Sequence, residues 1–166
     1  ETKLNTSVDR IGIWWLIGAA VATIVLWQIP YGDYILYPFS ILATWFHEMG
    51  HGLAAIFLGG NFLQLKIFPN GSGVATYTYD GRFFLGQIGR AIVAAAGLLG
   101  PPIAGAILIL ASRSFKTASI SLKILGGFLL LSVLIWVRSL FGIVAILLLG
   151  LIILGIGIKG NRWFQG

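Results

Sequence analysis

The chain has 166 residues, of which 58% are hydrophobic and 10% charged, whereas soluble domains carry about 25% charged residues. Apolar segments of roughly 20 residues are long enough to cross a bilayer, and several follow one another here, which predicts an integral, multi-pass membrane protein in contact with lipid. The net charge of +6 is spread over segment boundaries and forms no dense basic patch, which argues against nucleic-acid binding, and the lack of cysteine excludes disulfides, thiol catalysis and cysteine-bound zinc.

Two helices are predicted in the first part of the chain. Residues 11–29, "IGIWWLIGAAVATIVLWQI", form the first span, with tryptophans near its two ends as boundary aromatics. This segment is too long for a typical signal-peptide core and lacks a convincing A-x-A cleavage site, so we expect a retained anchor. After a short turn, "PYGDY", a second helix covers 34–58 and ends at a Gly-Gly pair.

A β-hairpin is predicted over 61–79. The stretches "NFLQLKIF" and "GVATYTY" alternate in part between apolar and polar residues, are rich in aromatic and β-branched residues, and are separated by "PNGSG". Because an open strand edge cannot face lipid, we expect the hairpin at the membrane interface or buried against helices.

The last part of the chain predicts three more helical segments. Residues 86–112 form a third span that is kinked at its Gly-Pro-Pro sequence. The apolar segments 124–137 and 139–158 are separated by Arg138. They predict either a tight helical hairpin within 120–158 or longer tilted spans, and we favour the hairpin.

These elements together predict an all-α polytopic membrane protein with about four to five transmembrane helices and a small β-hairpin insertion, in one membrane domain covering 1–166. Basic residues are divided almost equally between the two sides of the membrane, so the charge pattern does not give the orientation.

The stretch "ATWFHEMGHGLAA" contains both histidines of the chain, His47 and His51, and one of its two glutamates, Glu48. On a helix, residues i and i+4 lie on one face, so the two imidazoles can bind one zinc ion while the offset glutamate acts as general base. The alternative is a polar cluster that holds helices together. Ionisable groups in a bilayer cost on the order of 2.5–3.5 kcal/mol each and are usually functional, so we favour a metal site.

This motif carries a resemblance to a known family. "FHEMGHGLAAIFLGG" resembles the zinc-binding helix of the site-2 proteases, which are intramembrane metallopeptidases, and "NFLQLKIFPNGSGVATYT" resembles the β-hairpin beside their active site. With "AAAGLLGPPIAGA", the chain is most similar to the compact bacterial B-like branch of the family. The similarity covers about residues 40–110 and implies a bacterial inner membrane or another internal membrane.

By this resemblance, His47 and His51 are zinc ligands and Glu48 is the catalytic base. The implied reaction is the hydrolysis of a peptide bond in or near the membrane by zinc-activated water, usually in a single-span membrane protein. The zinc ion, Zn2+, is the implied cofactor.

The resemblance also implies where a substrate binds. A strand of the hairpin can hold an extended peptide by β-addition, which points to Val74 and Thr76, and the Gly-Pro-Pro segment points to Gly100 and Pro101. An equally weighted alternative is that the hairpin is simple interfacial structure. The Gly-Pro-Pro segment lacks the Asn that often follows Gly-Pro in the family, and close helix packing is the alternative explanation for it.

The sequence departs from the family pattern at the position of the third zinc ligand. A catalytic zinc site uses three protein ligands, and the family supplies an aspartate from a later span, but no Asp or Glu follows Asp80 in this chain. The ligand is therefore missing, lies beyond Gly166, or is an unexpected residue; Asp80 itself, in a D-G pair, is favoured as a turn residue. The chain starts without Met, and we expect it to be part of a longer polypeptide.

The missing ligand supports an alternative function. The protein would then be a catalytically inactive homologue that serves as a structural or assembly subunit and packs against partner helices in a larger membrane complex. A transporter is a weaker hypothesis, because its polar residues would line a path through several spans, whereas here they lie together in one.

Overall fold

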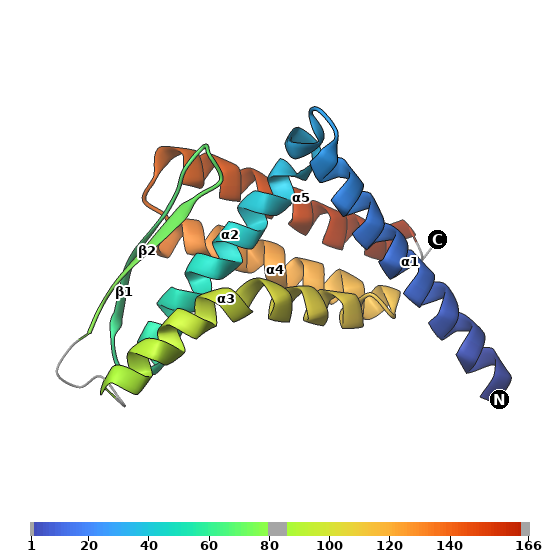
Figure 1. Ribbon diagram of the computed structural model, residues 1–166, viewed down its shortest axis with the longest axis horizontal. Helices are drawn as coiled ribbons and strands as arrows, with labels where there is room; N and C mark the ends of the chain where they lie inside the picture. Colours follow the sequence, from blue (N-terminus) through green and yellow to red (C-terminus); the bar gives the residue numbers. More distant parts are fainter. Residues whose placement is uncertain (1, 80–85, 164–166) are drawn as a thin grey trace. The chain divides into compact units, whose positions relative to one another are not determined.

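The computed structural model describes residues 2–79 and 86–163, with side chains for 12–79 and 86–160. The described residues form five helices and a two-stranded sheet (Figure 1), so the predicted fold class is confirmed. The elements are α1 (Thr2–Gln28), α2 (Gly32–Phe57), β1 (Asn61–Ile67), β2 (Gly73–Thr78), α3 (Gly86–Ala111), α4 (Phe115–Ile135) and α5 (Leu140–Trp163).

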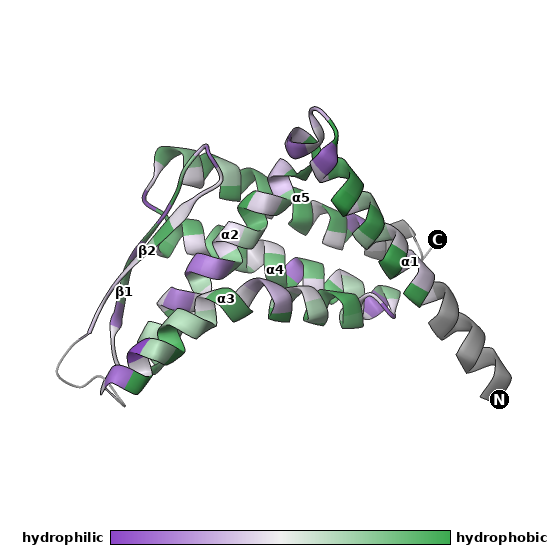
Figure 2. Ribbon diagram, viewed as in Figure 1, coloured by the Kyte–Doolittle hydropathy of each residue, from purple (hydrophilic) through white to green (hydrophobic). Residues whose placement is uncertain are grey.

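Three helices in the described part of the chain, α3, α4 and α5, are each long and apolar enough to cross a membrane. The segments Gly12–Gln28 and Gly32–Phe57 meet this condition only together, as a pair bent by 119°, which gives up to four candidate spans if the pair is counted as one. Hydrophobic residues dominate α4 and α5, whereas α2 and the hairpin contain hydrophilic stretches (Figure 2). Many large apolar side chains of the span helices are exposed, as expected of a multi-pass membrane protein in lipid.

The chain divides into two units, Glu1–Phe39 and Ser40–Gly166. In the first unit, α1 is followed by a tight turn in which the N–H of Gly32 donates to the carbonyl of Ile29 (3.1 Å). Tyr31 has a φ of 69° there. A Cβ on Gly32 would collide with the carbonyl of Leu26, so only glycine fits at this position.

In the second unit, one face of α2 packs against α4. Ile41, Trp45 and Met49 follow each other at intervals of four residues and are buried. The Trp45 ring meets the Phe128 ring edge-on with centroids 5.3 Å apart, and its indole N–H donates to the Ser132 hydroxyl (2.9 Å). This contact anchors the motif helix in the core, because the buried indole donor is satisfied.

A second face of α2 lies close to α3. A Cβ on Gly50 would collide with the carbonyl of Ala96, and one on Gly100 would lie 2.6 Å from the carbonyl oxygen of Phe46. Glycines on both helices therefore permit backbone-to-backbone contact at this crossing.

The predicted kink falls within a helix that the structure shows to be continuous. α3 runs through Pro101 and Pro102 without a break in its assignment. It changes direction near its middle (Figure 1). Proline removes a backbone hydrogen bond and bends the helix axis. Helices of membrane proteins tolerate this without ending, because neighbouring groups can satisfy the freed carbonyl.

The hairpin predicted over 61–79 corresponds to β1 and β2, which pair antiparallel from Asn61↔Thr78 to Ile67↔Gly73. The register shifts between Phe62 and Gln64, which marks a β-bulge or irregularity. At the turn, Gly71 has a φ of 83°, a conformation that favours glycine.

The outer edge of β1 is bonded to the segment between α4 and α5. The N–H of Leu65 donates to the carbonyl of Trp136 (2.8 Å), and the N–H of Arg138 donates to the carbonyl of Leu65 (2.9 Å). The Ser139 hydroxyl accepts from the N–H of Ile67 (2.9 Å) and donates to its carbonyl (2.8 Å). The outward backbone groups of Leu65 and Ile67 are thus satisfied within the protein, which protects this part of the edge from pairing with another chain.

Helices α4 and α5 pack closely along their length. A Cβ on Gly126 would lie 2.8 Å from the backbone nitrogen of Leu154, and the Ser119 hydroxyl donates to the carbonyl of Gly157 (2.6 Å). The turn between them contains Arg138, whose guanidinium donates to the carbonyl of Ile135 (2.6 Å) at the end of α4. A basic side chain at a helix C-terminus satisfies carbonyls that have no partner within the helix.

Candidate functional site

The imidazoles of His47 and His51 converge on one point beside α2. Their Nε2 atoms lie 3.1 Å apart, and the ring centroids are 4.7 Å apart at an interplanar angle of 88°. Two imidazole nitrogens that bind one tetrahedral zinc at about 2.0–2.1 Å lie about 3.3 Å from each other. Since both rings present the same nitrogen at nearly this separation, the pair fits a zinc ion.

The orientation of His51 is set by α3. Its Nδ1 lies 2.8 Å from the carbonyl oxygen of Val93, so this nitrogen carries the proton and donates. Nε2 is then the unprotonated nitrogen: its lone pair accepts from His47 Nε2 in this structure and is the one that a metal ligand requires. Such an outer contact of the other ring nitrogen typically orients ligating histidines. The ring lies directly over Gly97, where a Cβ would collide with it.

Glu48 is buried, with 8% of its surface exposed, and its carboxylate lies against β2. Its Oε2 accepts a hydrogen bond from the backbone N–H of Ala75 (2.7 Å). A Cβ on Gly73 would lie 2.7 Å from both Glu48 Cγ and Thr44 Cγ2. The Thr44 hydroxyl also donates to the carbonyl of Gly71 (2.6 Å), so two contacts join this third face of α2 to the hairpin.

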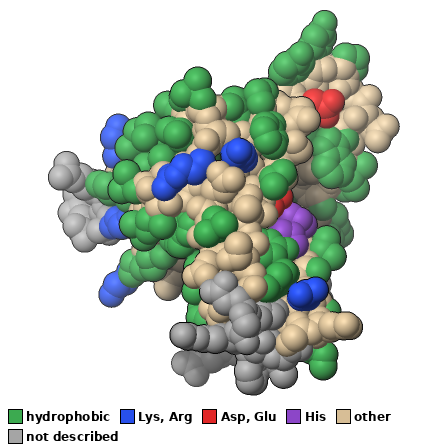
Figure 3. Space-filling view, turned by 90° about the vertical axis from the view of Figure 1, so that its left-hand side faces the viewer, with side chains coloured by type: hydrophobic (Ala, Val, Ile, Leu, Met, Phe, Trp, Pro, Cys, Tyr) green, Lys and Arg blue, Asp and Glu red, His purple; other side chains and the backbone are tan. Residues whose placement is uncertain are grey.

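These groups border a cavity of about 310 Å³ lined by Ala43, Thr44, His47, Glu48, Gly73 and Pro101. In Figure 3 histidine side chains reach the surface beside carboxylate atoms, among hydrophobic side chains. The cavity therefore opens to the outside while most of its surroundings are apolar.

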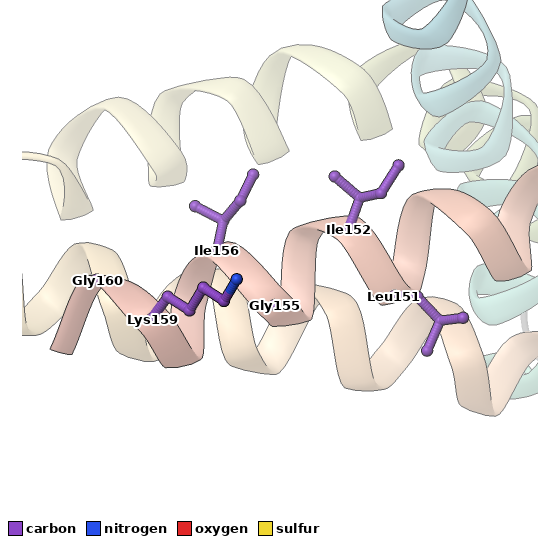
Figure 4. A pocket seen from close by; sticks show the side chains of 6 residues that line it. All are labelled: Leu151, Ile152, Gly155, Ile156, Lys159 and Gly160. Atoms are coloured by element: carbon purple, nitrogen blue, oxygen red, sulfur yellow. The ribbon is translucent and has the colours of Figure 1, made fainter. Parts of the chain in front are cut away.

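Two larger cavities are lined almost entirely by apolar residues and glycine. One of about 510 Å³ is lined by side chains of α5 alone, of which Lys159 is the only charged one (Figure 4). Another, of about 540 Å³, lies along α3 and is lined only by Ile, Leu, Ala and Gly. Neither is lined by a His, Cys, Asp or Glu, so the smaller cavity is the candidate site.

Tyr77 on β2 lies beside the histidines, with its ring centroid 6.4 Å from that of His51. Burial raises the pKa of Tyr77, and its hydrogen bond with Tyr79 and the negative charges of Tyr79 and Glu48 raise it further. Its phenol therefore stays protonated at neutral pH and can donate a hydrogen bond.

The predicted site residues are distributed as follows. His47, Glu48 and His51 lie together, and Pro101 lines the cavity with them. Gly100 contacts the backbone of α2 and also lines the apolar cavity on α3. Among the residues that the structure describes, no third His, Cys, Asp or Glu completes a metal-binding group with the two histidines. Asp80 lies outside the described residues.

The hairpin residues named from the sequence do not line the cavity. Leu65 uses both backbone groups toward the α4–α5 turn, so Leu65 and Ala75 form a non-hydrogen-bonded pair in the ladder. In an antiparallel ladder the neighbours Val74 and Thr76 then direct their backbone groups to β1. Gly73 and Ala75 are the hairpin residues that meet α2.

Sequence reasoning missed four positions in the site: Gly73, Ala75, Val93 and Gly97. Two of them act through backbone atoms, which carry no signature in the residue type, and the other two matter because they lack a side chain. The only available signal was the presence of glycines in elements where glycine is otherwise unfavourable.

Comparison with protein-family models matches residues 16–166 to the family described as Peptidase M50B-like. Comparison with curated proteins and with solved structures gives no match.

Proposed function

This chain belongs to the Peptidase M50B-like family, of the site-2 protease kind, and from that premise we propose that it is a zinc-dependent endopeptidase that hydrolyses peptide bonds in or near the membrane. The observation that carries the proposal is the convergence of two imidazole Nε2 atoms, 3.1 Å apart, next to a buried glutamate on a cavity wall. We further propose a bacterial inner membrane or another internal membrane as its location.

His47 and His51 would hold the zinc ion, with His51 oriented by the Val93 carbonyl. Zinc supplies, when bound, a Lewis acid that polarises a peptide carbonyl and lowers the pKa of water. Glu48 is the general base, which takes a proton from water and passes it to the leaving amine. Because Oε2 already accepts from Ala75, Oε1 is the oxygen that handles this proton.

The substrate segment would lie in the cavity between α2, β2 and α3, in contact with Gly73 and Pro101. Addition of a substrate strand is restricted by the structure around the hairpin. The edge of β1 is bonded to the α4–α5 turn, and β2 contacts α2 up to Ala75. We propose that Val74, which is 49% exposed, and Thr76 contact the substrate only through their side chains, because their backbone groups face β1.

A second candidate function rests on the absence of a third metal ligand among the described His, Cys, Asp and Glu residues. The protein would then be an inactive homologue that packs against other helices as a structural subunit. The two functions predict different zinc contents, because a site of two histidines alone binds the metal weakly.

The test is zinc per chain, measured by elemental analysis of detergent-purified protein prepared without chelators. For a peptidase, we expect near-stoichiometric zinc in the wild type and in Glu48→Gln, and its loss in His47→Ala. Glu48→Gln should retain zinc but lose hydrolysis of a single-span membrane substrate. Zinc-free wild type would contradict the peptidase and favour the structural subunit. Loss of zinc in Asp80→Asn would identify the third ligand.

A further inference from the structure

We infer that the backbone N–H of Ala75 is a positioning group for Glu48, so that strand β2 holds the general base in place. This inference rests on the proposed function and adds to it a contribution from the hairpin. The contact joins Ala75 N to Glu48 Oε2 over 2.7 Å, a short distance typical of charge-assisted hydrogen bonds.

The N–H of Ala75 is available because of the register of the hairpin. Ala75 lies opposite Leu65, and Leu65 directs its own N–H and carbonyl away from β2, to Trp136 and Arg138. In such a pair the backbone groups of both residues face outward from the ladder. Glu48 therefore takes a donor that the sheet itself does not use.

The surroundings leave the Glu48 side chain little freedom. Its Cγ lies against the backbone of Gly73, where a Cβ would be only 2.7 Å away. The bond from Thr44 to the carbonyl of Gly71 holds the hairpin to the same face of α2, one turn before Glu48. A buried carboxylate without a donor would be costly, and Ala75 supplies the donor.

The consequence for the reaction is geometric. The bond from Ala75 to Oε2 restricts rotation of the Glu48 carboxylate, and it therefore restricts where Oε1 can lie relative to the adjacent His47. Displacement of a reacting group by ~1 Å can reduce the rate by about 10²-fold. Since the donor is a backbone group, side-chain substitutions at position 75 leave it in place, except for proline, which has no N–H.

The first experiment compares Ala75→Pro with Ala75→Gly, which keeps the N–H. Proline is tolerated on strands where the N–H faces away from the ladder. We expect kcat of Ala75→Pro to fall by about 100-fold relative to Ala75→Gly, with KM within about twofold and zinc content unchanged. Equal kcat values, or a loss confined to KM, would overturn the inference, the latter by assigning the N–H to substrate binding.

The second experiment does not depend on turnover. In protein labelled with ¹⁵N-alanine, the Ala75 amide is identified by its disappearance in Ala75→Gly, and its hydrogen exchange is measured. We expect exchange at least about tenfold faster in Glu48→Ala than in wild type, since a lost net hydrogen bond is worth about 1.4 kcal/mol or more here, and protection retained in Glu48→Gln. Unchanged exchange in Glu48→Ala would refute the contact.

The two experiments separate the inference from the proposed function. Zinc-loaded wild type that protects the Ala75 amide but cleaves no substrate would overturn the peptidase and leave the contact established. If Ala75→Pro does not fold, the exchange measurement decides the inference alone.

Discussion

Gly97 has no side chain because the imidazole of His51 occupies the space in which one would lie. The neighbouring turn of α3 also supplies the Val93 carbonyl that orients this imidazole. The position of His51, a proposed zinc ligand, thus depends on two residues more than forty positions away in the sequence.

We predict that Gly97→Ala weakens zinc binding by about 10–100-fold, the usual effect of disturbing an outer contact of a ligating histidine. The methyl group would displace the ring from the Val93 carbonyl. Gly105→Ala, on the same helix, is the matched control, because nothing lies within 4 Å of the added Cβ. Competition with a fluorescent zinc chelator measures both affinities, and equal affinities would show that the ring has room to move.

At this scale, sequence reasoning predicted the pair His47 and His51 because the spacing i, i+4 places both on one helix face regardless of the rest of the fold. The partners of His51 and Glu48, Val93 and Ala75, could not be predicted from the sequence, since they contribute backbone atoms that only the tertiary structure brings near. Local patterns carry no information about such contacts.

Among the elements, α2 has three faces with three different neighbours. Trp45 contacts α4, Gly50 contacts α3, and Glu48 contacts β2. The hairpin in turn is held on its other side by Ser139, which bonds both backbone groups of Ile67. The site is therefore assembled from elements that all meet at the motif helix or at the hairpin.

We predict that Ser139→Ala destabilises the protein by about 1–3 kcal/mol, because it leaves a backbone donor and acceptor on β1 without their partner. Ser72→Ala removes only an exposed hydrogen bond to Asn70 at the hairpin turn, and should change stability by less than about 0.5 kcal/mol. Chemical unfolding in detergent measures both. A Ser139→Ala variant as stable as Ser72→Ala would mean that water replaces the hydroxyl.

The elements themselves were largely predictable. The Gly-Gly pair after α2 and the "PNGSG" turn mark boundaries through local backbone chemistry, and the observed helix and strands end beside them. The pairing of β1 with the turn after α4 was not predictable, because the bond from Leu65 to Trp136 has no counterpart in the local sequence.

On the scale of the whole molecule, the pair α4 and α5 supports both the core partner of Trp45 and the turn bonded to β1. Small residues allow this pair to approach closely, which is how helices associate where lipid provides no hydrophobic drive. Composition predicted the membrane environment, but the close contacts depend on which face of each helix a glycine occupies.

Gly126 and Gly127 allow a direct test of this dependence. A Cβ on Gly126 would lie within 2.8–2.9 Å of the backbone and Cβ of Leu154, whereas one on Gly127 would meet nothing within 4 Å. We predict that Gly126→Ala lowers stability by about 1–3 kcal/mol through overpacking. Gly127→Ala should raise it by up to about 1 kcal/mol through helix propensity. Thermal unfolding in detergent gives both shifts, and shifts of the same sign would contradict the close packing of the two helices.

The bonds between β1 and the turn after α4 also impose an order on biosynthesis. Ile67 and Ser139 are separated by 72 residues, so a ribosome adding about 5–20 residues per second completes Ser139 roughly 4–14 s after Ile67. During that interval the outer edge of β1 has no partner from its own chain. In the nascent protein, we therefore expect water or a chaperone to bond to this edge of the hairpin. Helix α2 completes its contacts only after α4 has been synthesised, because Trp45 bonds to Ser132.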